Sequence, residues 1–468
     1  MPTISEFARA FANGASSRDL IDQCLDRIAN PDGEGGRAFL KVHAEKARAD
    51  ADRHDKMRHQ RTAASPFAGI PVSVKDLFDL AGDTTTAGSI ALRDAPPASH
   101  DAIAITRLKA AGFIPIGRTN MTEFAFSGLG INPHYGTPLN AYDRKAARIP
   151  GGSSSGAAVS VTDAMAVAAI GTDTGGSCRI PAALCGLVGF KPTAARVPLD
   201  GVVPLSTSLD SVGSIATSVK CCAVLDAVMA EQPPVDLPAF PLTRLRLAVP
   251  QTVVLDGLDS DVSRAFAAAQ TRLSQAGVRI VDIPLQELAE LSQINSKGGF
   301  GAAESYAFHR PLIGAKSKLY DPRVLSRILR GREQDAADYI DLVRARADFT
   351  RRVRAIIAPF DALLLPTVPV VAPRISDLET DDSYRDANLL MLRNPTVANL
   401  LDGCSISLPC HAAGEAPVGL MLIGGHGEDA TLFAIAAAIE TLLASNGSHL
   451  ALEQGAMPAA ADLASAQH

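Results

Sequence analysis

Two short segments of this 468-residue chain place serine and threonine hydroxyls among glycines: residues 151–156 read GGSSSG and residues 171–177 read GTDTGGS. Glycine adopts positive φ and lets a ligand or another chain segment come close. Serines set among glycines therefore suit a nucleophile that lies beside a group of backbone N–H donors. The chemistry that this pattern favours is covalent catalysis by a serine hydroxyl.

The alternative interpretation is a flexible linker. Gly/Ser linkers stay flexible because nothing apolar holds them. Here the two clusters flank residues 157–170, in which only Ser160, Thr162 and Asp163 are polar. We therefore expect a buried helix and a buried strand between the clusters.

A serine nucleophile needs a base, which is usually histidine. His134 is the nearest histidine, and the others are scattered without catalytic or metal-ligand spacing. Residues 152–156 formally match the G-x-S-x-G elbow of α/β-hydrolases, but Pro150 and the loop from residue 120 do not read as the strand that the elbow requires. A lysine can replace histidine if burial lowers its pKa to near 7. Lys75 is the candidate, because it ends an apolar strand at 70–76, although most lysines are simply exposed charges.

The elements that must position these residues alternate between strands and helices. Hydrophobic periodicity predicts strands at 70–76, 113–117, 245–249, 278–283, 362–366, 405–408 and 417–423, and helices at 17–28, 37–61, 101–111, 218–230, 260–276 and 429–443. Longer helices are expected up to about residue 357, an acidic surface loop at 376–386 and a turn at 189–193. This alternation predicts an α/β fold with a large mixed sheet and helices on both faces.

Composition bounds the class of protein. A hydrophobic content of 47% and a net charge of −6 are normal for a soluble enzyme and disfavour a nucleic-acid partner. Seven cysteines without CxxC pairs favour a reducing, cytoplasmic setting. We expect no signal peptide and no membrane-spanning helix, because no apolar run is long enough.

The motifs resemble the amidase signature family of amide hydrolases. Residues 151–154 are similar to its GGSS element, 171–177 to its G-[ST]-D-x-G-G-S element, 69–76 to its lysine strand, 120–125 to its NMxEFA segment and 417–424 to its PVGLQLIG strand. The resemblance covers about 69–217 and 363–440. Two departures are Ser155, where the family often has glycine, and Cys178, where it often has a β-branched residue.

The resemblance implies the roles of individual residues. Ser177 would be the nucleophile, Ser153 a proton relay that follows a cis peptide bond, and Lys75 the base. The backbone N–H groups of Thr174, Gly175, Gly176 and Ser177 would form the oxyanion hole. The loop 120–140 would contact substrate. The resemblance also implies residues that hold the two loops in place, namely Ser154, Asp173 and Arg179. The residues expected to line the substrate pocket are Met121, Phe126, Gly128 and Tyr135.

The sequence pattern together with the resemblance predicts the domain boundaries and the activity. We expect a helical segment at 1–65 packed on the core, an amidase signature domain at 66–445 with a pocket-shaping subdomain at 245–357, and a flexible tail at 446–468. The expected activity is hydrolysis of small-molecule amides, and possible further substrates are carbamates, anilides and esters, with no metal or organic cofactor, by a monomer or homodimer. Two alternatives stay open: a glutaminase subunit of a tRNA-dependent amidotransferase, and a catalytically silent ligand-binding member.

Overall fold

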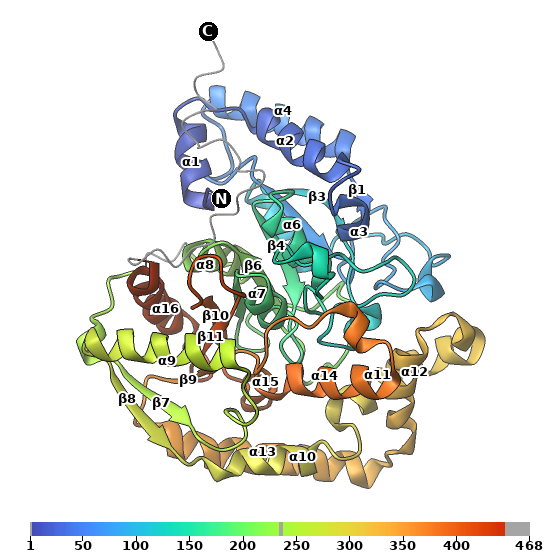
Figure 1. Cartoon of the computed structure of the whole chain (residues 1–468). Coiled ribbons are helices and arrows are strands. Elements are labelled where there is room, and N and C mark those ends of the chain that lie inside the picture. The colour runs from blue at the N-terminus through green and yellow to red at the C-terminus, as the bar shows by residue number, and fades with distance from the viewer. Residues whose placement is uncertain (1, 234–236, 445–468) are drawn as a thin grey trace.

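An eleven-stranded mixed sheet forms the centre of the computed structural model, which describes residues 2–233 and 237–444 (Figure 1). The strand order is β1-β3-β2-β4-β6-β5-β10-β11-β9-β7-β8. The bounds are β1 (Phe39–Val42), β2 (Pro71–Lys75), β3 (Ile114–Thr119), β4 (Ala168–Thr172), β5 (Val188–Lys191), β6 (Val212–Ala216), β7 (Arg246–Pro250), β8 (Arg279–Ile283), β9 (Ala362–Pro366), β10 (Ser405–Pro409) and β11 (Gly419–Ile423). β2 pairs in parallel with β3 and β4, and β7 with β8 and β9, whereas the other neighbours are antiparallel. The expected mixed sheet is confirmed.

Helices surround this sheet and cover both of its faces. The α-helices are α1 (Ile4–Ala12), α2 (Ser17–Ala29), α3 (Gly35–Ala38), α4 (Ala44–His59), α5 (Ile103–Ala110), α6 (Ser155–Thr162), α7 (Arg179–Leu184), α8 (Val219–Met229), α9 (Ser260–Gln275), α10 (Leu291–Ile294), α11 (Gly299–Lys316), α12 (Pro322–Leu329), α13 (Ala336–Ile357), α14 (Asp381–Arg393), α15 (Thr396–Leu401) and α16 (Asp429–Ala444). Short 3-10 turns lie at Ile90–Leu92, Glu123–Ala125, Arg144–Ala146, Leu242–Arg244, Gln286–Glu290, Ser317–Leu319, Arg330–Glu333 and Ile375–Leu378.

Alternate residues of the central strands point into different apolar clusters. On β4, Ala168 and Ile170 join the cluster that contains residues of α8 and α16, whereas Ala169 joins the cluster formed with α6 and α7. Successive strand side chains point to opposite faces, so α8 and α16 cover one face and α6 and α7 the other. Burial on both faces explains why strands such as β9 and β11 are apolar throughout.

Three local predictions were wrong. The stretch 37–61 is not one helix, because β1 interrupts it and adds an edge strand to β3. Residues 188–191 form β5 rather than a turn. Helix α14 takes up most of the expected acidic loop, because Tyr384, Asn388 and Met391 recur at helical spacing and are buried beneath an acidic outer face.

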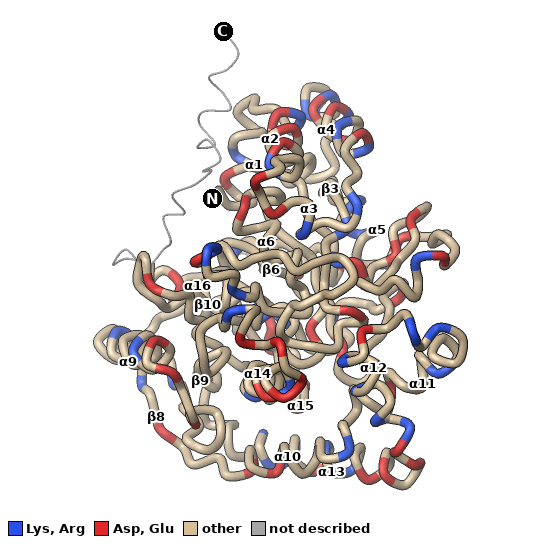
Figure 2. Tube along the Cα trace, turned by 45° about the vertical axis from the view of Figure 1, so that its right-hand side comes forward, with Lys and Arg blue, Asp and Glu red and all other residues tan. Residues whose placement is uncertain are grey.

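The segment 245–357 contributes β7 and β8 to the same sheet and then continues into α10–α13. None of the described helices is long and apolar enough to cross a bilayer. Acidic and basic residues are interspersed along α2 and α4 (Figure 2), and Arg18 pairs with both Asp22 and Asp52. The proposed tail at 446–468 lies outside the described residues.

Candidate active site

Lys75 is the last residue of β2 and is fully buried. Its Nζ donates to Ser153 Oγ at 2.7 Å and to Thr172 Oγ1 at 2.8 Å. Burial lowers the pKa of Lys75 from 10.5 to about 8, although Cys178, Asp173 and Asp210 act in the opposite direction. A substantial fraction of this amine is therefore neutral near physiological pH, as a base requires.

The two Gly/Ser clusters lie against each other at the ends of β4 and α6. The Gly152–Ser153 peptide bond is cis, and the Ser154 N–H donates to the Ser177 carbonyl at 3.3 Å. A Cβ on Gly171 would lie 2.7 Å from Ser154 Oγ, so only glycine allows this approach. The fold thus brings Ser177, which is 3% exposed, beside the pair formed by Lys75 and Ser153.

The backbone between Thr174 and Ser177 supplies the expected N–H donors in part. The Gly176 N–H is already engaged, because it donates to Asp173 Oδ1 at 2.8 Å. Within residues 2–233 and 237–444, the N–H groups of Thr174, Gly175 and Ser177 have no acceptor. Three of the four expected donors therefore remain free to stabilise an oxyanion.

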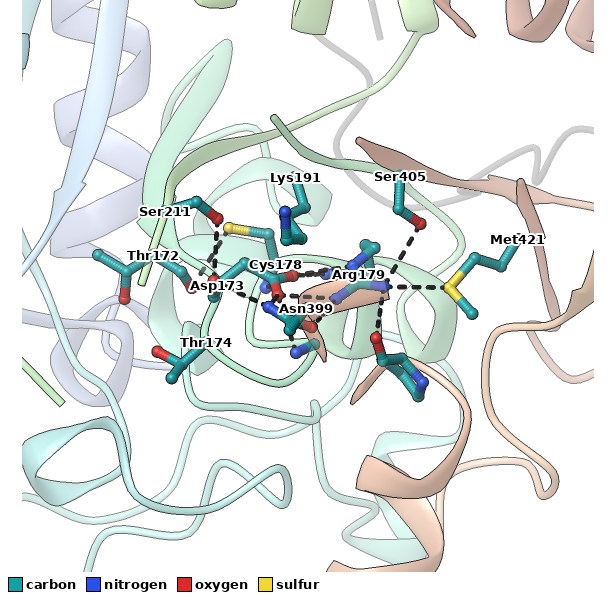
Figure 3. A network of polar contacts seen from close by, with 12 residues as sticks. Thr172, Asp173, Thr174, Cys178, Arg179, Lys191, Ser211, Asn399, Ser405 and Met421 are labelled. Atoms are coloured by element: carbon teal, nitrogen blue, oxygen red, sulfur yellow. Dashed lines mark hydrogen bonds and ion pairs between the residues drawn. The ribbon is translucent and has the colours of Figure 1, made fainter. Parts of the chain in front are cut away.

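A buried ion pair supports the loop that carries Ser177 (Figure 3). Arg179 donates to Asp173 through Nη2 at 2.8 Å and Nε at 3.0 Å, and both side chains are 0% exposed. Burial alone would raise the pKa of Asp173, but the charge and hydrogen bonds of Arg179, with a hydrogen bond from Asn399, hold it well below its usual range. Asp173 also accepts the Cys178 N–H, so one carboxylate fixes both sides of Ser177.

The loop after β3 contacts Ser153 and its neighbour through backbone hydrogen bonds. The Thr122 N–H donates to the Ser153 carbonyl at 3.1 Å, and the Gly152 N–H donates to the Gly128 carbonyl at 2.8 Å. Phe126 is half-buried, and a Cβ on Gly301 of α11 would lie 3.6 Å from its ring. These contacts join the loop to both the serine cluster and α11.

The other two expected pocket residues lie differently. Met121 is fully buried, next to Gly88. Tyr135 is half-buried, and its ring lies 5.9 Å from the Arg93 guanidinium carbon. The structure places Phe126 and Gly128 on the loop that meets the serines, and places Met121 in the core and Tyr135 on the outer side beside Arg93.

Three polar residues that contact Lys75 or the loop 172–179 were missed by sequence reasoning. Thr172 receives a hydrogen bond from Lys75, Asn399 binds both Asp173 and Arg179, and Asp210 accepts the Thr174 hydroxyl. Thr172 lies inside the recognised cluster and could have been found there. Asn399 and Asp210 have no local sequence signal, because only the chain path brings them to the site.

The structure gives less support to a different nucleophile, a different base or a metal site. Burial raises the pKa of Cys178 to about 12, so this thiol stays protonated at neutral pH. His134 Nε2 lies 3.0 Å from Glu123 Oε1 and is not bonded to Lys75 or Ser153. Among the residues that the structure describes, no three His, Cys, Asp or Glu side chains are grouped so as to hold a metal ion.

Known proteins resemble this chain over most of its length. The family model described as Amidase matches residues 19–433. The chain is 37% identical to 2-amino-5-chloromuconic acid deaminase of Comamonas testosteroni over 91% of this chain and 92% of that protein. It is 34% identical to the A subunit of glutamyl-tRNA(Gln) amidotransferase from Synechococcus sp. (strain WH7803), over 92% and 95%. A crystal structure of an amidase superposes with a TM-score of 0.85 at 30% identity, covering 94% of this chain and 99% of that one. The chain therefore belongs to the amidase family of amide-hydrolysing enzymes.

Proposed function

We propose that Lys75, Ser153 and Ser177 form the catalytic triad of a serine amidase. The observation that carries the proposal is the buried amine of Lys75, which lies 2.7 Å from Ser153 Oγ. Neutral Lys75 accepts the Ser153 proton while Ser153 accepts the Ser177 proton, and Ser177 Oγ attacks the amide carbonyl. The N–H groups of Thr174, Gly175 and Ser177 stabilise the oxyanion.

The rest of the cycle runs through the same groups. The C–N bond breaks as the relay returns the proton to the leaving nitrogen, because an unprotonated amine leaves badly. The acyl group is then bonded to Ser177 Oγ. Water loses a proton to the relay and attacks this ester, which releases the carboxylic acid and restores the serine hydroxyl.

We further propose that the substrate is a small amide that carries a carboxylate. The deaminase relative is named for an acid. In this chain, Arg327 of α12 donates to the Phe126 carbonyl at 2.6 Å and its guanidinium carbon lies 5.0 Å from the Tyr384 ring centroid. No carboxylate of the described residues pairs with Arg327, so this guanidinium has donors left for a substrate anion.

The test is product release by the purified protein from a primary amide, an anilide, a carbamate, a p-nitrophenyl ester and glutamine, with K75A and S177A alongside. We expect amide turnover that falls by about 10²- to 10⁴-fold in K75A. A fluorophosphonate should label the wild type and not S177A. Full labelling of S177A would refute the nucleophile.

The second candidate is a glutaminase component of a larger enzyme, which the similarity to the amidotransferase relative favours. In that case, the isolated protein would release little ammonia from any amide. Release from glutamine would appear only with a copurifying partner. Turnover of simple amides by the isolated chain would support the first candidate, the serine amidase. For that amidase we propose a cytoplasmic location and a monomeric or homodimeric state.

A further inference from the structure

Asp210 is a buried carboxylate that the catalytic cycle above does not use. It precedes β6 by two residues, and Val212 of β6 pairs with Thr172, so the fold delivers Asp210 to the end of β4 where Lys75 binds Thr172. One carboxylate oxygen accepts the Leu205 and Ser206 N–H groups at 2.9 and 3.0 Å, and the other accepts the Thr174 hydroxyl at 2.5 Å.

Asp210 has no ion-pair partner among the described residues, although it is only 5% exposed. Its hydrogen bonds lower its pKa, but burial dominates and raises it to about 6. The cation that acts on this carboxyl group is Lys75, and the effect is mutual, because Asp210 favours the ammonium form of Lys75. The two groups are therefore coupled in their ionisation.

We propose that Asp210 is a positioning residue of this amidase: its carboxylate fixes Thr174 in the loop that carries the nucleophile, and its charge sets the pH at which Lys75 loses its proton. The inference rests on the proposed role of Lys75 as the base. An ionised Asp210 favours the ammonium form of Lys75, so removal of this charge lowers the pH at which Lys75 loses its proton.

Cys178 and Asp173 also favour the ammonium form of Lys75, so Asp210 is one of three groups that act on it, and it differs from the other two in its surroundings. Asp173 is neutralised by Arg179, and Cys178 is a protonated thiol. Asp76, which directly follows the strand of Lys75, pairs with Arg118 at 2.6 Å. Lys75 itself donates to two uncharged hydroxyls, those of Ser153 and Thr172.

Glu304 offers a matched control for the loop. It accepts the Ser206 hydroxyl at 2.5 Å and the Ser208 N–H at 3.0 Å, so it holds the same loop from the side of α11. Glu304 does not act on the pKa of Lys75. Its replacement loosens the loop without removing a charge that faces the lysine.

The experiment measures the rate at which a fluorophosphonate labels Ser177 between pH 6 and 10, with S177A as the blank. The wild-type rate should rise with a midpoint near 8. D210N should move this midpoint down by about half a pH unit to one unit, since a nearby opposite charge is lost. T174V should move it in the same direction by less, because Asp210 loses a donor and is neutral over more of the range. T174S should restore the midpoint, and E304Q should leave it in place.

A D210N midpoint equal to that of the wild type would overturn the inference, as would an equal shift in E304Q. If D210N fails to fold, the Thr174 variants decide: an unmoved midpoint in T174V overturns the inference, and a downward shift that T174S reverses supports it. A K75A protein that is still labelled with the wild-type pH profile would instead refute the assignment of Lys75 as the base. Failure of the Asp210 inference is therefore distinguishable from failure of the proposed triad.

Discussion

Replacement of Lys75 by arginine retains a buried cation but removes the neutral form. The pKa of Lys75 falls from 10.5 to about 8 on burial, which corresponds to about 3 kcal/mol against the ammonium. At pH 7 about one-tenth of such lysines are neutral, compared with about one in 3,000 for an ordinary lysine. The structure thus supplies about 300 times more free base at pH 7. Arginine stays protonated at every accessible pH, so K75R should lose activity throughout.

The assay is kcat/KM for an amide without an ionisable group. We expect a wild-type rise of about tenfold between pH 7 and pH 9, with a midpoint near 8. K75R should be lower by about 10²- to 10⁴-fold across the range.

Lys191 provides the control, because burial also lowers its pKa to about 8. Within the part of the chain that the structure describes, its ammonium group donates only to the backbone carbonyls of Pro192 and Gly403, so K191M should keep the midpoint near 8. A rising limb that survives in K75R, or that disappears in K191M, would refute the assignment of this pKa to Lys75.

Three further predictions concern substrate binding and stability. R327Q should raise KM for a carboxylated amide by about 10- to 100-fold and leave KM for an uncharged amide unchanged. The control is R323Q, which should change neither KM because the Arg323 guanidinium already pairs with Asp381. Equal effects of R327Q on the two substrates in steady-state kinetics would contradict the proposed contact. R179M should lower the free energy of unfolding, measured by urea denaturation, by about 3 to 5 kcal/mol, because it leaves Asp173 buried and unpaired. The double variant R179M/D173N should recover part of this loss. A loss below about 1 kcal/mol in R179M would contradict the prediction. Burial raises the pKa of Glu440 from 4.5 to about 7, so the folded state binds the proton more tightly than the unfolded state. Stability therefore falls as the pH rises through this window, by up to about 3 kcal/mol. E440Q should abolish that slope in thermal unfolding at pH 4.5 and pH 7.

The family, the sheet class and the triad candidates could be predicted from the sequence, because each depends on local signals. Lys75 ends a strand whose alternation shows in five residues, and Ser153 and Ser177 lie in glycine-rich clusters. The apolar segment between those clusters also predicted α6 and β4, which the structure shows. Sequence periodicity is a weak signal where the exposed face of a helix is polar. For this reason the first half of α14 was predicted as part of a loop, although its buried residues recur at helical spacing.

Only the tertiary structure decided which distant residues complete the site. The strand order β4-β6-β5 does not follow the chain, so the antiparallel pairing of β6 with β4 carries Asp210 to Lys75 and Thr172. Asn399 reaches Asp173 from a segment more than two hundred residues further along. Burial, which lowers the pKa of Lys75, is likewise a property of the closed sheet and its covering helices rather than of any motif. The sequence thus determined which groups are present, and the packing determined their partners and ionisation.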